Sequence, residues 1–405
     1  MPWILRTYLT FVPFVLLIYG YVGWRMYTSV NSILPWPRDI VRICFLGVCG
    51  YLNLYPFLMI LLHVAGLQVL AKSAREGGRF WDFLFGYPFW IGLIIVVELL
   101  PWLLALDFIR LPFYPFFEKF KPAWLRIQYQ AILSLFIIIS IYAFVKTFLD
   151  TNRIRVTQRT LIVADLPPGM AGLRIVHLSD IQADARTRKG KLKRLVRKVN
   201  KLDPDLIFFS GDLVTSGTKH IDIAAATLGQ MESRYGTYAC IGDHDIWSSE
   251  QQIVEALAEN NVKYFSDQNE LIHVGGDSIF ATFVTSTYSK RTTHNKLYFL
   301  MGQQPRGGID LVVTHQPSDF LVEVAAERGY HLFLGGHTHG GQVVFNLMGF
   351  SLTAARFETS YYRGFHWVEK MLVSINNGIG FTFAPIRFRA PAEITLIKVV
   401  ARKPL

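Results

Sequence analysis

The sequence predicts an all-α membrane-spanning region, residues 1–150, followed by an α/β or α+β sheet domain, residues 151–405. Two observations support this prediction. Hydrophobic residues make up 51% of the 405 residues, which is high for a soluble enzyme, and the excess lies almost wholly before residue 150. Beyond that point short apolar runs alternate with helical patterns, and Gly and Pro separate them regularly. The change in composition therefore marks the expected domain boundary.

The first region contains four apolar segments that are long enough to cross a bilayer, whose hydrocarbon core of about 30 Å needs roughly 20 residues in a helix. They comprise residues 8–24, 43–70, 84–109 and 128–149, and we expect kinks at Pro56 and Pro101. The first segment resembles a signal peptide, but no small-residue cleavage site follows it, so we expect it to be retained. Glu98 and Asp107 in the third segment are either functional carboxylates or interfacial and helix-packing residues.

The formal net charge of +11 is spread over both regions and favours an anionic partner, which could be a phospholipid surface, a nucleotide or a nucleic acid. Basic residues flank both sides of the spans to a similar extent. With four spans the two termini share a side, for which we expect the cytoplasm. The three cysteines, Cys44, Cys49 and Cys240, support neither a disulfide framework nor a cysteine-based zinc site.

Five short apolar runs in the second region are typical of β-strands that alternate with helices. They comprise residues 173–178, 206–210, 237–241, 309–314 and 331–334. Polar residues follow each run, and small residues such as Gly211 and Gly336 beside them let backbone and ions approach closely. The functional groups at these strand ends are Asp180, Gln182, Asp212, Asp243, His244, Asp245, His315, His337 and His339. Oxygen and imidazole ligands together suit divalent first-row metals, so the sequence predicts a metal site at these strand ends.

The order of these motifs, S-D-x-x, G-D, G-x-H-D, T-H and G-H-T-H-G-G-Q, resembles that of the calcineurin-like metallophosphoesterases. The resemblance covers residues 160–400, and the octapeptide at 335–342 is its most specific motif. The closing segments at 373–380, 385–388 and 391–394 are similar to those of membrane-associated bacterial phosphodiesterases. The chain is thus identified by resemblance as a metal-dependent hydrolase of phosphoric esters.

The resemblance implies a four-layer α+β fold, in which a β-sandwich is flanked by helices, with two divalent metal ions at the carboxyl ends of its strands. Carried over by position, the first ion would be held by Asp180, Gln182, Asp212 and His339. The second would be held by Asp212, Asp243, His315 and His337, so that Asp212 bridges the pair. Two such ions clamp the phosphoryl oxygens and lower the pKa of a bridging water.

Two further residues receive catalytic roles from the same resemblance. His244 would donate a hydrogen bond to the phosphoryl oxygens or a proton to the leaving group. Asp245 would orient His244 by accepting a hydrogen bond from its other ring nitrogen.

Two positions depart from the pattern of the family, which usually has His in place of Gln182 and Asn in place of Asp243. Both changes introduce harder oxygen ligands, so we expect a preference for Mn²⁺ or Mg²⁺, with Fe and Zn²⁺ as alternatives. The competing interpretation is a weakened first metal site or a catalytically inactive relative.

Basic residues outside the motifs have two open interpretations. The run between Arg186 and Lys201 predicts a helix with a solvated face, or one that rests on anionic headgroups or guides a phosphorylated substrate. Arg387 and Arg389 would either pair with substrate phosphate or form structural ion pairs.

The leading functional hypothesis is hydrolysis of a phosphodiester or pyrophosphate bond in a lipid-linked substrate. UDP-2,3-diacylglucosamine is one candidate implied by the resemblance, and a glycerophospholipid or undecaprenyl phosphate is another. The alternatives are a nuclease or cyclic-nucleotide phosphodiesterase, and a non-catalytic membrane sensor or scaffold with a degenerate metal site. The chain has no recognisable nucleic-acid module, so we expect membrane lipids as partners and no nucleic acid. We expect the protein to lie in a bacterial inner membrane. The sequence identifies no protein partner.

Overall fold

The computed structural model describes residues 3–67, 70, 78–109, 117–303, 308–347, 349–382 and 384–402. These residues divide into two compact units. The first contains residues 1–149 together with the short segments Phe345–Ser351 and Ala384–Ile386, and the second contains the remainder of the chain. The second region of the sequence therefore contributes two short segments to the helical unit.

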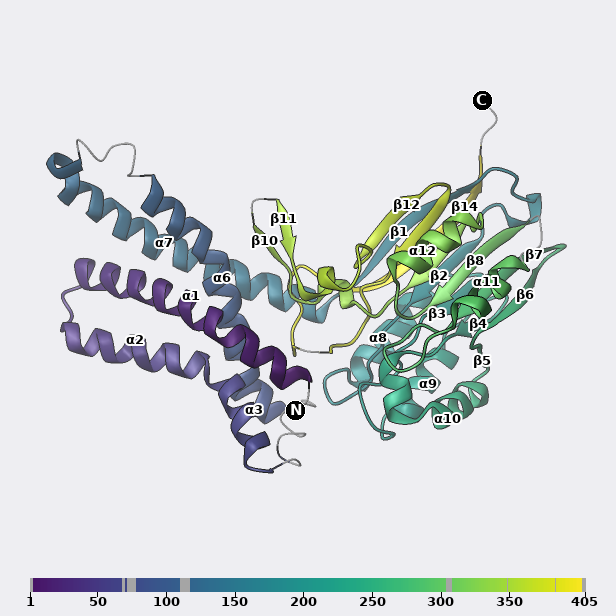
Figure 1. The fold of residues 1–405 in the computed structure, drawn as a ribbon, viewed down its shortest axis with the longest axis horizontal. Helices are drawn as coiled ribbons and strands as arrows, with labels where there is room; N and C mark the ends of the chain where they lie inside the picture. The colour runs from purple at the N-terminus through teal and green to yellow at the C-terminus, as the bar shows by residue number, and fades with distance from the viewer. Residues whose placement is uncertain are drawn as a thin grey trace. The chain divides into compact units, whose positions relative to one another are not determined.

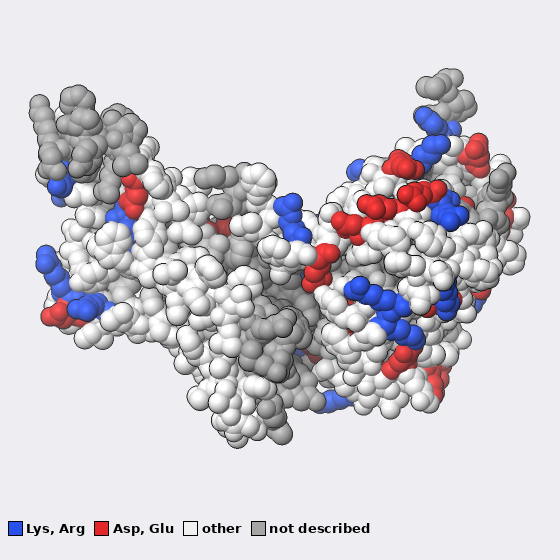
Figure 2. All heavy atoms as spheres, in the orientation of Figure 1, with Lys and Arg blue, Asp and Glu red and all other residues white. Residues whose placement is uncertain are grey.

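The helical unit is built from long apolar helices (Figure 1). They are α1 (Trp3–Ile33), α2 (Arg38–Leu52), α3 (Leu54–Val64), α6 (Tyr87–Phe108) and α7 (Phe117–Asn152), with the short α5 (Arg79–Trp81) and the π-helix η1 (Asp82–Gly86) directly before α6. The segment Phe345–Ser351 carries β10 (Phe345–Leu347) and the start of β11 (Phe350–Leu352). On the face drawn in Figure 2, the described part of this unit carries few charged side chains, and large apolar side chains such as Phe14, Leu17 and Ile138 are exposed. An apolar exterior of this kind suits a hydrocarbon environment.

Among the described residues three helices are long and apolar enough to cross a membrane: Leu9–Ile33, Asp82–Phe108 and Phe120–Asn152. The second predicted span, 43–70, is instead two helices, α2 and α3, bent by 53° at Asn53, and its residues 68 and 69 lie outside the described part. For the expected number of about four spans, the described residues thus provide three candidates, or four if the bent pair counts as one span. The break precedes Pro56 because a proline ring clashes with the carbonyl four residues earlier, here that of Leu52. Helix α6, in contrast, continues through Pro101.

One polar cluster joins three helices inside this unit. Asp107 on α6 lies 2.7 Å from the guanidinium of Arg25 on α1, and it accepts hydrogen bonds from Tyr21 at 2.7 Å and Gln128 at 3.0 Å. A partly buried carboxylate in an apolar environment needs such partners, because an unpaired charge is costly there. Asp107 therefore has the helix-packing role that was one of its two predicted roles.

The second unit contains two six-stranded mixed sheets (Figure 1). In spatial order the first sheet comprises β1 (Ile154–Val163), β14 (Ala392–Ala401), β2 (Arg174–Leu178), β3 (Leu206–Phe209), β4 (Thr237–Ala239) and β5 (Val262–Tyr264). The second comprises β12 (Gly364–Val368), β13 (Met371–Ile375), β9 (Leu332–Gly335), β8 (Ile309–Thr314), β7 (Asp277–Val284) and β6 (Gln268–Val274). All five predicted runs form strands, with bounds within two residues of those expected.

Apolar side chains from facing surfaces of the two sheets, such as Phe208 and Phe283, form one buried core between them. The outer face of the first sheet packs on α8 (Lys189–Asn200), α9 (Ile221–Gly229) and α10 (Asp243–Glu259). The outer face of the second packs on α11 (His294–Gly302) and α12 (Asp319–Glu327). Strands β2, β3 and β4 run parallel, as do β7, β8 and β9, so the carboxyl ends of each set lie at one edge of its sheet. Ligand sites in open parallel sheets occur outside those ends.

Candidate metal centre

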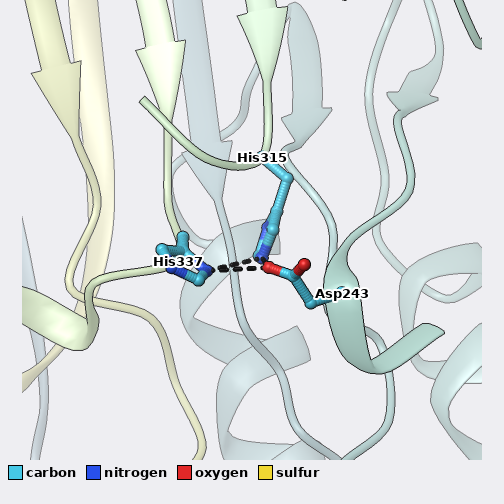
Figure 3. A group of neighbouring side chains, drawn as sticks. All are labelled: Asp243, His315 and His337. Carbon is cyan, nitrogen blue, oxygen red and sulfur yellow. Dashed lines mark hydrogen bonds and ion pairs between the residues drawn. The ribbon is translucent and has the colours of Figure 1, made fainter. Parts of the chain in front are cut away.

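The carboxyl ends of β4, β8 and β9 bring Asp243, His315 and His337 into contact (Figure 3). Nδ1 of His337 lies 3.0 Å from Oδ2 of Asp243 and 3.3 Å from Nε2 of His315. Nε2 of His315 lies 3.5 Å from the same carboxylate oxygen. Potential ligand atoms of all three lie within 4.8 Å of one another, which suits a shared cation.

A second cluster adjoins the first through His315. Potential ligand atoms of Asp180, Asp212 and His315 also lie within 4.8 Å of one another. Asp212 accepts a hydrogen bond from Nε2 of Gln182 at 2.6 Å, and Nε2 of His339 lies 3.3 Å from Oδ1 of Asp180. The structure thus places all seven residues predicted as metal ligands in one connected region.

Three oxygen atoms in this region are buried without a hydrogen-bond partner: Oδ1 of Asp180, Oε1 of Gln182 and Oδ2 of Asp243. A buried oxygen that accepts no hydrogen bond is costly, unless a cation or water satisfies it. Carboxylate and amide oxygens are the donors that hard divalent cations prefer. The residues present therefore fit metal ions at both clusters.

The backbone holds five of the predicted ligands in the left-handed region, where non-glycine residues are uncommon. Their φ values are 48° for Asp180, 47° for Gln182, 62° for Asp212, 70° for His337 and 50° for His339. Such conformations cost of order 1–3 kcal/mol each and gather at functional sites. The chain therefore tolerates local strain in order to turn these side chains toward one region.

Two glycines make the close packing of these loops possible. A Cβ at Gly242 would collide with Oδ1 of Asp212, and one at Gly336 would collide with Oγ of Ser179. Any side chain at either position would displace a loop that carries a predicted ligand. The small residues noted in the sequence are therefore required by space.

Electrostatic interactions favour positive charge at the first cluster. Burial alone would lower the pKa of His315, but the carboxylates of Asp212 and Asp243 outweigh burial and raise that pKa well above its usual value. Burial also opposes a charge on His337, yet Asp243 and Glu358 raise its pKa to about 9. Burial alone would raise the pKa of Asp243, but the adjacent imidazoles of His315 and His337 hold that pKa far below its usual range. This concentration of negative charge is what a divalent cation requires.

His244 lies beside the clusters. Its backbone N–H donates to Oδ1 of Asp212 at 2.9 Å, and its ring Nδ1 lies 2.6 Å from the carbonyl oxygen of Thr215. Because a carbonyl only accepts, Nδ1 carries the proton, and Nε2 lies 3.4 Å from the hydroxyl of Thr382. The ring of Trp247 packs edge-on at 5.0 Å.

Asp245 does not orient His244, and this expectation is corrected. Its buried carboxylate instead accepts hydrogen bonds from three backbone N–H groups. Those of Asp212 at 2.8 Å and Leu213 at 2.7 Å belong to the loop after β3, and that of Gly242 lies at 3.1 Å. Burial, and then the nearby Asp212, raise the pKa of Asp245 to about 7. Asp245 is therefore a loop-organising residue, because the first turn of α10 directs its side chain toward the loop after β3.

Sequence reasoning missed two contacts at the metal centre. The carboxylate of Glu358 lies 3.1 Å from Nε2 of His337. The guanidinium of Arg387, for which we expected either pairing with substrate phosphate or a structural ion pair, is fully buried and donates to the carbonyl oxygens of Gly380 and His339. Neither Glu358 nor Arg387 lies at a predicted strand end, and the motifs therefore did not indicate these contacts.

The basic run forms α8, and most of its charged side chains are exposed. Lys191 differs, because its side chain is buried with Nζ 4.2 Å from the centre of the Phe381 ring. Burial, and then Arg387, lower the pKa of Lys191 well below its usual value. The run is therefore one helix with an exposed basic face and one buried lysine.

The comparisons with known proteins concern the same part of the chain. Residues 173–341 match the family model for calcineurin-like phosphoesterases. A transmembrane protein with a metallophosphoesterase domain from Danio rerio is 29% identical over 284 residues, covering 66% of this chain and 62% of that protein. Its counterpart from Bos taurus is 30% identical over 257 residues, covering 59% and 56%, and an uncharacterised metallophosphoesterase from Campylobacter jejuni is 25% identical, covering 69% and 71%. The chain thus spans about three fifths of the length of the two vertebrate relatives.

Among solved structures, a 5'-nucleotidase precursor from Thermus thermophilus is 14% identical with a TM-score of 0.34, covering 56% of this chain and 54% of that one. Residues 173–341 include every predicted metal ligand, and these ligands follow the ends of the strands described above. Residues 173–341 are therefore a calcineurin-like phosphoesterase domain, and the relatives that match the chain include transmembrane proteins.

Proposed function

We propose that the chain is a membrane-anchored phosphoesterase that uses two divalent cations to hydrolyse a phosphodiester or pyrophosphate bond in a lipid-linked substrate. The observation that supports this most strongly is the pair of adjoining clusters that share His315, each with ligand atoms within 4.8 Å. Two neighbouring cations are the arrangement used for in-line displacement at phosphorus.

Asp180, Gln182, Asp212 and His339 would hold one cation, and Asp212, Asp243, His315 and His337 would hold the other. When bound, the cations would polarise the phosphoryl group and lower the pKa of a water molecule. Gln182 would bind through Oε1, which is buried and accepts no hydrogen bond. The oxygen-rich donor set favours Mn²⁺ or Mg²⁺ over Zn²⁺.

His244 would act on the substrate directly. Its Nδ1 donates to the carbonyl of Thr215, which holds the ring so that Nε2 points away from that carbonyl. A protonated Nε2 would donate a hydrogen bond to a phosphoryl oxygen or a proton to the leaving group. The carboxylate of Asp245 would support this by holding the Asp212 loop in place.

A lipid-linked substrate is supported by the candidate spans and by the transmembrane relatives. UDP-2,3-diacylglucosamine is one candidate, and a glycerophospholipid is another. A bacterial inner membrane with a cytoplasmic catalytic unit is part of the same proposal.

The test uses the full chain in lipid nanodiscs with Mn²⁺, and compares it with the variants Asp212→Asn and Asp222→Asn. Asp222 is an exposed residue of α9 and controls for the change in charge. The samples are incubated with extracted lipids, UDP-linked lipid precursors, a cyclic nucleotide and single-stranded DNA, and products are identified by mass spectrometry. We expect a lipid-derived phosphate product from the wild type and from Asp222→Asn, and its loss in Asp212→Asn.

Other outcomes separate the alternatives. Turnover restricted to the cyclic nucleotide or DNA would replace the lipid-linked substrate with a nucleotide. Mn²⁺ binding without turnover of any of these, or of bis-p-nitrophenyl phosphate, would favour a sensor or scaffold.

A further inference from the structure

Glu358 connects the rim of the metal centre to one of its proposed ligands. It follows the short 3-10 helix η5 (Ala354–Phe357), and its carboxylate is 41% exposed. One oxygen lies 3.1 Å from Nε2 of His337, whose other ring nitrogen lies 3.0 Å from Asp243. The imidazole therefore stands between a carboxylate at the rim and the cluster of proposed ligands.

This contact determines which nitrogen of His337 faces the cluster as an acceptor. An ionised carboxylate only accepts hydrogen bonds, so Nε2 carries the proton when it donates to Glu358. In the neutral ring the lone pair then belongs to Nδ1, which points toward Asp243 and His315. A neutral imidazole nitrogen with its lone pair directed inward is the form that binds a metal ion.

The loop that carries Glu358 is tied to the loop that carries His337. The hydroxyl of Thr353 donates to the carbonyl of Gly341 at 2.9 Å, and the hydroxyl of Thr338 donates to the carbonyl of Tyr362 at 2.6 Å. These bonds lie on either side of Glu358 in the sequence. Their effect is to hold its side chain within reach of the imidazole.

A third anchor comes from α12. The carboxylate of Asp319 accepts hydrogen bonds from the hydroxyl of Thr359 at 2.7 Å and from the backbone N–H of Ser360 at 3.0 Å. The two residues directly after Glu358 are thus fixed to a helix of the sheet domain. These hydrogen bonds therefore help to hold Glu358 in contact with His337.

Tyr288 restrains His337 from another side. Its ring packs edge-on against the imidazole at 5.1 Å, and its hydroxyl lies 3.4 Å from Nε2. Its backbone N–H also donates to Oδ1 of Asp243 at 2.5 Å, which leaves Oδ2 directed at the two imidazoles. Both Glu358 and Tyr288 therefore hold the ring of His337 in place.

From this geometry we infer that Glu358 is a positioning residue of the metal centre, which directs Nδ1 of His337 toward a cation shared with Asp243 and His315. The inference rests on the proposed function only in requiring that a cation binds there. Carboxylate partners of this kind fix the tautomer and orientation of a metal-binding histidine, and their loss typically weakens metal affinity about 10–100-fold.

The experiment measures the binding of Mn²⁺ alone to the full chain in detergent, with free Mn²⁺ followed by electron paramagnetic resonance. The variants are Glu358→Ala, Glu358→Gln and, as a matched control, Glu327→Gln at the exposed end of α12. We expect Glu358→Ala to weaken one Mn²⁺ site about 10–100-fold. Glu358→Gln should weaken it less, because an amide oxygen still accepts from Nε2, and Glu327→Gln should bind like the wild type.

The thermal unfolding midpoint of each metal-free variant provides the second readout. A positioning role predicts reduced affinity with midpoints equal to that of Glu327→Gln. Unchanged Mn²⁺ affinity in both Glu358 variants would overturn the inference while leaving the two-metal proposal intact. Absence of Mn²⁺ binding to the wild type, or binding unaffected by Asp212→Asn, would instead refute the proposed function. If Glu358→Ala lowers the midpoint, the affinity of the isosteric Glu358→Gln variant decides the question.

Discussion

Nη2 of Arg387 lies 3.3 Å from Nδ1 of His339, and both side chains are buried. Nε2 of the same ring lies 3.3 Å from Oδ1 of Asp180, on the side of the other proposed metal ligands. Burial, and then the charge of Arg387, lower the pKa of His339 well below its usual value. The two histidines of the G-H-T-H-G-G-Q motif therefore have opposite partners, a carboxylate for His337 and a guanidinium for His339.

This asymmetry predicts two unequal metal sites. The site of His339 also contains Gln182, a weaker ligand than the usual histidine, so we expect a Mn²⁺ titration to show one tight and one weak step. Gln182→His should tighten the weak step and leave the tight one unchanged. Two equal steps in a calorimetric titration of the wild type would contradict this prediction.

Replacement of His244 should reduce turnover without loss of metal. Its ring contacts Thr215 and Thr382, and neither is a proposed ligand. We expect His244→Gln to lower kcat about 10²–10⁴-fold, the usual contribution of a general acid or base. Metal content measured by mass spectrometry should equal that of the wild type, and His220→Gln serves as the control. Loss of bound metal in His244→Gln would show that its role is structural.

Asp245→Asn should destabilise the sheet domain. The carboxylate satisfies buried backbone N–H groups of Asp212, Leu213 and Gly242, and an amide offers one accepting oxygen in place of two. Each buried donor left without a partner costs about 1–3 kcal/mol. We expect a lower unfolding midpoint for the metal-free protein than for Asp222→Asn. An unchanged midpoint would argue against this role for Asp245.

His177 should make the stability of the sheet domain depend on pH. Burial lowers its pKa from 6.5 to about 3, and its ring nitrogens lie 2.9 Å from Ser210 and 3.4 Å from Ser374. Because the folded-state pKa lies below the unfolded value, the unfolded chain binds this proton first as the pH falls. The contribution of neutral His177 to the free energy of unfolding is therefore complete above pH 6.5 and declines from there toward pH 3.

Between pH 6.5 and 5 the free energy of unfolding that His177 contributes falls by about 2 kcal/mol, at about 1.4 kcal/mol for each pH unit. Chemical unfolding of the metal-free protein at several pH values measures this change. The difference between the wild type and His177→Gln isolates this residue from other titrating groups. A difference that does not vary with pH would contradict the assignment.

The exposed face of α8 provides the last prediction. Lys193 and Arg197 are exposed one turn apart, and a basic residue near an anionic leaflet contributes about 1 kcal/mol. Lys193→Glu with Arg197→Glu should reduce activity on anionic vesicles and leave hydrolysis of a soluble phosphodiester unchanged. Equal loss on both substrates would indicate damage to the fold.

The succession of strands along the sheet domain could be predicted from the sequence, because the patterns that indicate strands are local. The run at 309–314 forms β8 with those bounds, and Asp212, Asp243 and His315 follow their strands as expected. Parallel strands end at a shared edge, so residues far apart in the chain meet there. The clustering of Asp243, His315 and His337 therefore follows from the pattern.

Hydrogen-bond partners could not be predicted in the same way. Asp245 was expected to bind its neighbour His244, but helix geometry directs it to the Asp212 loop. The expected second span breaks at Asn53, because the effect of Pro56 falls on the preceding turn.

The sequence by itself determined the apolar helical region, the succession of strands and the identity of the residues gathered at their ends. Only the tertiary structure decided that Glu358 contacts His337 and that Arg387 contacts His339. The physical reason is range. Strand periodicity and glycine punctuation act over a few neighbouring residues, whereas these contacts depend on how separate loops pack, and single charged residues in loops carry no periodic pattern.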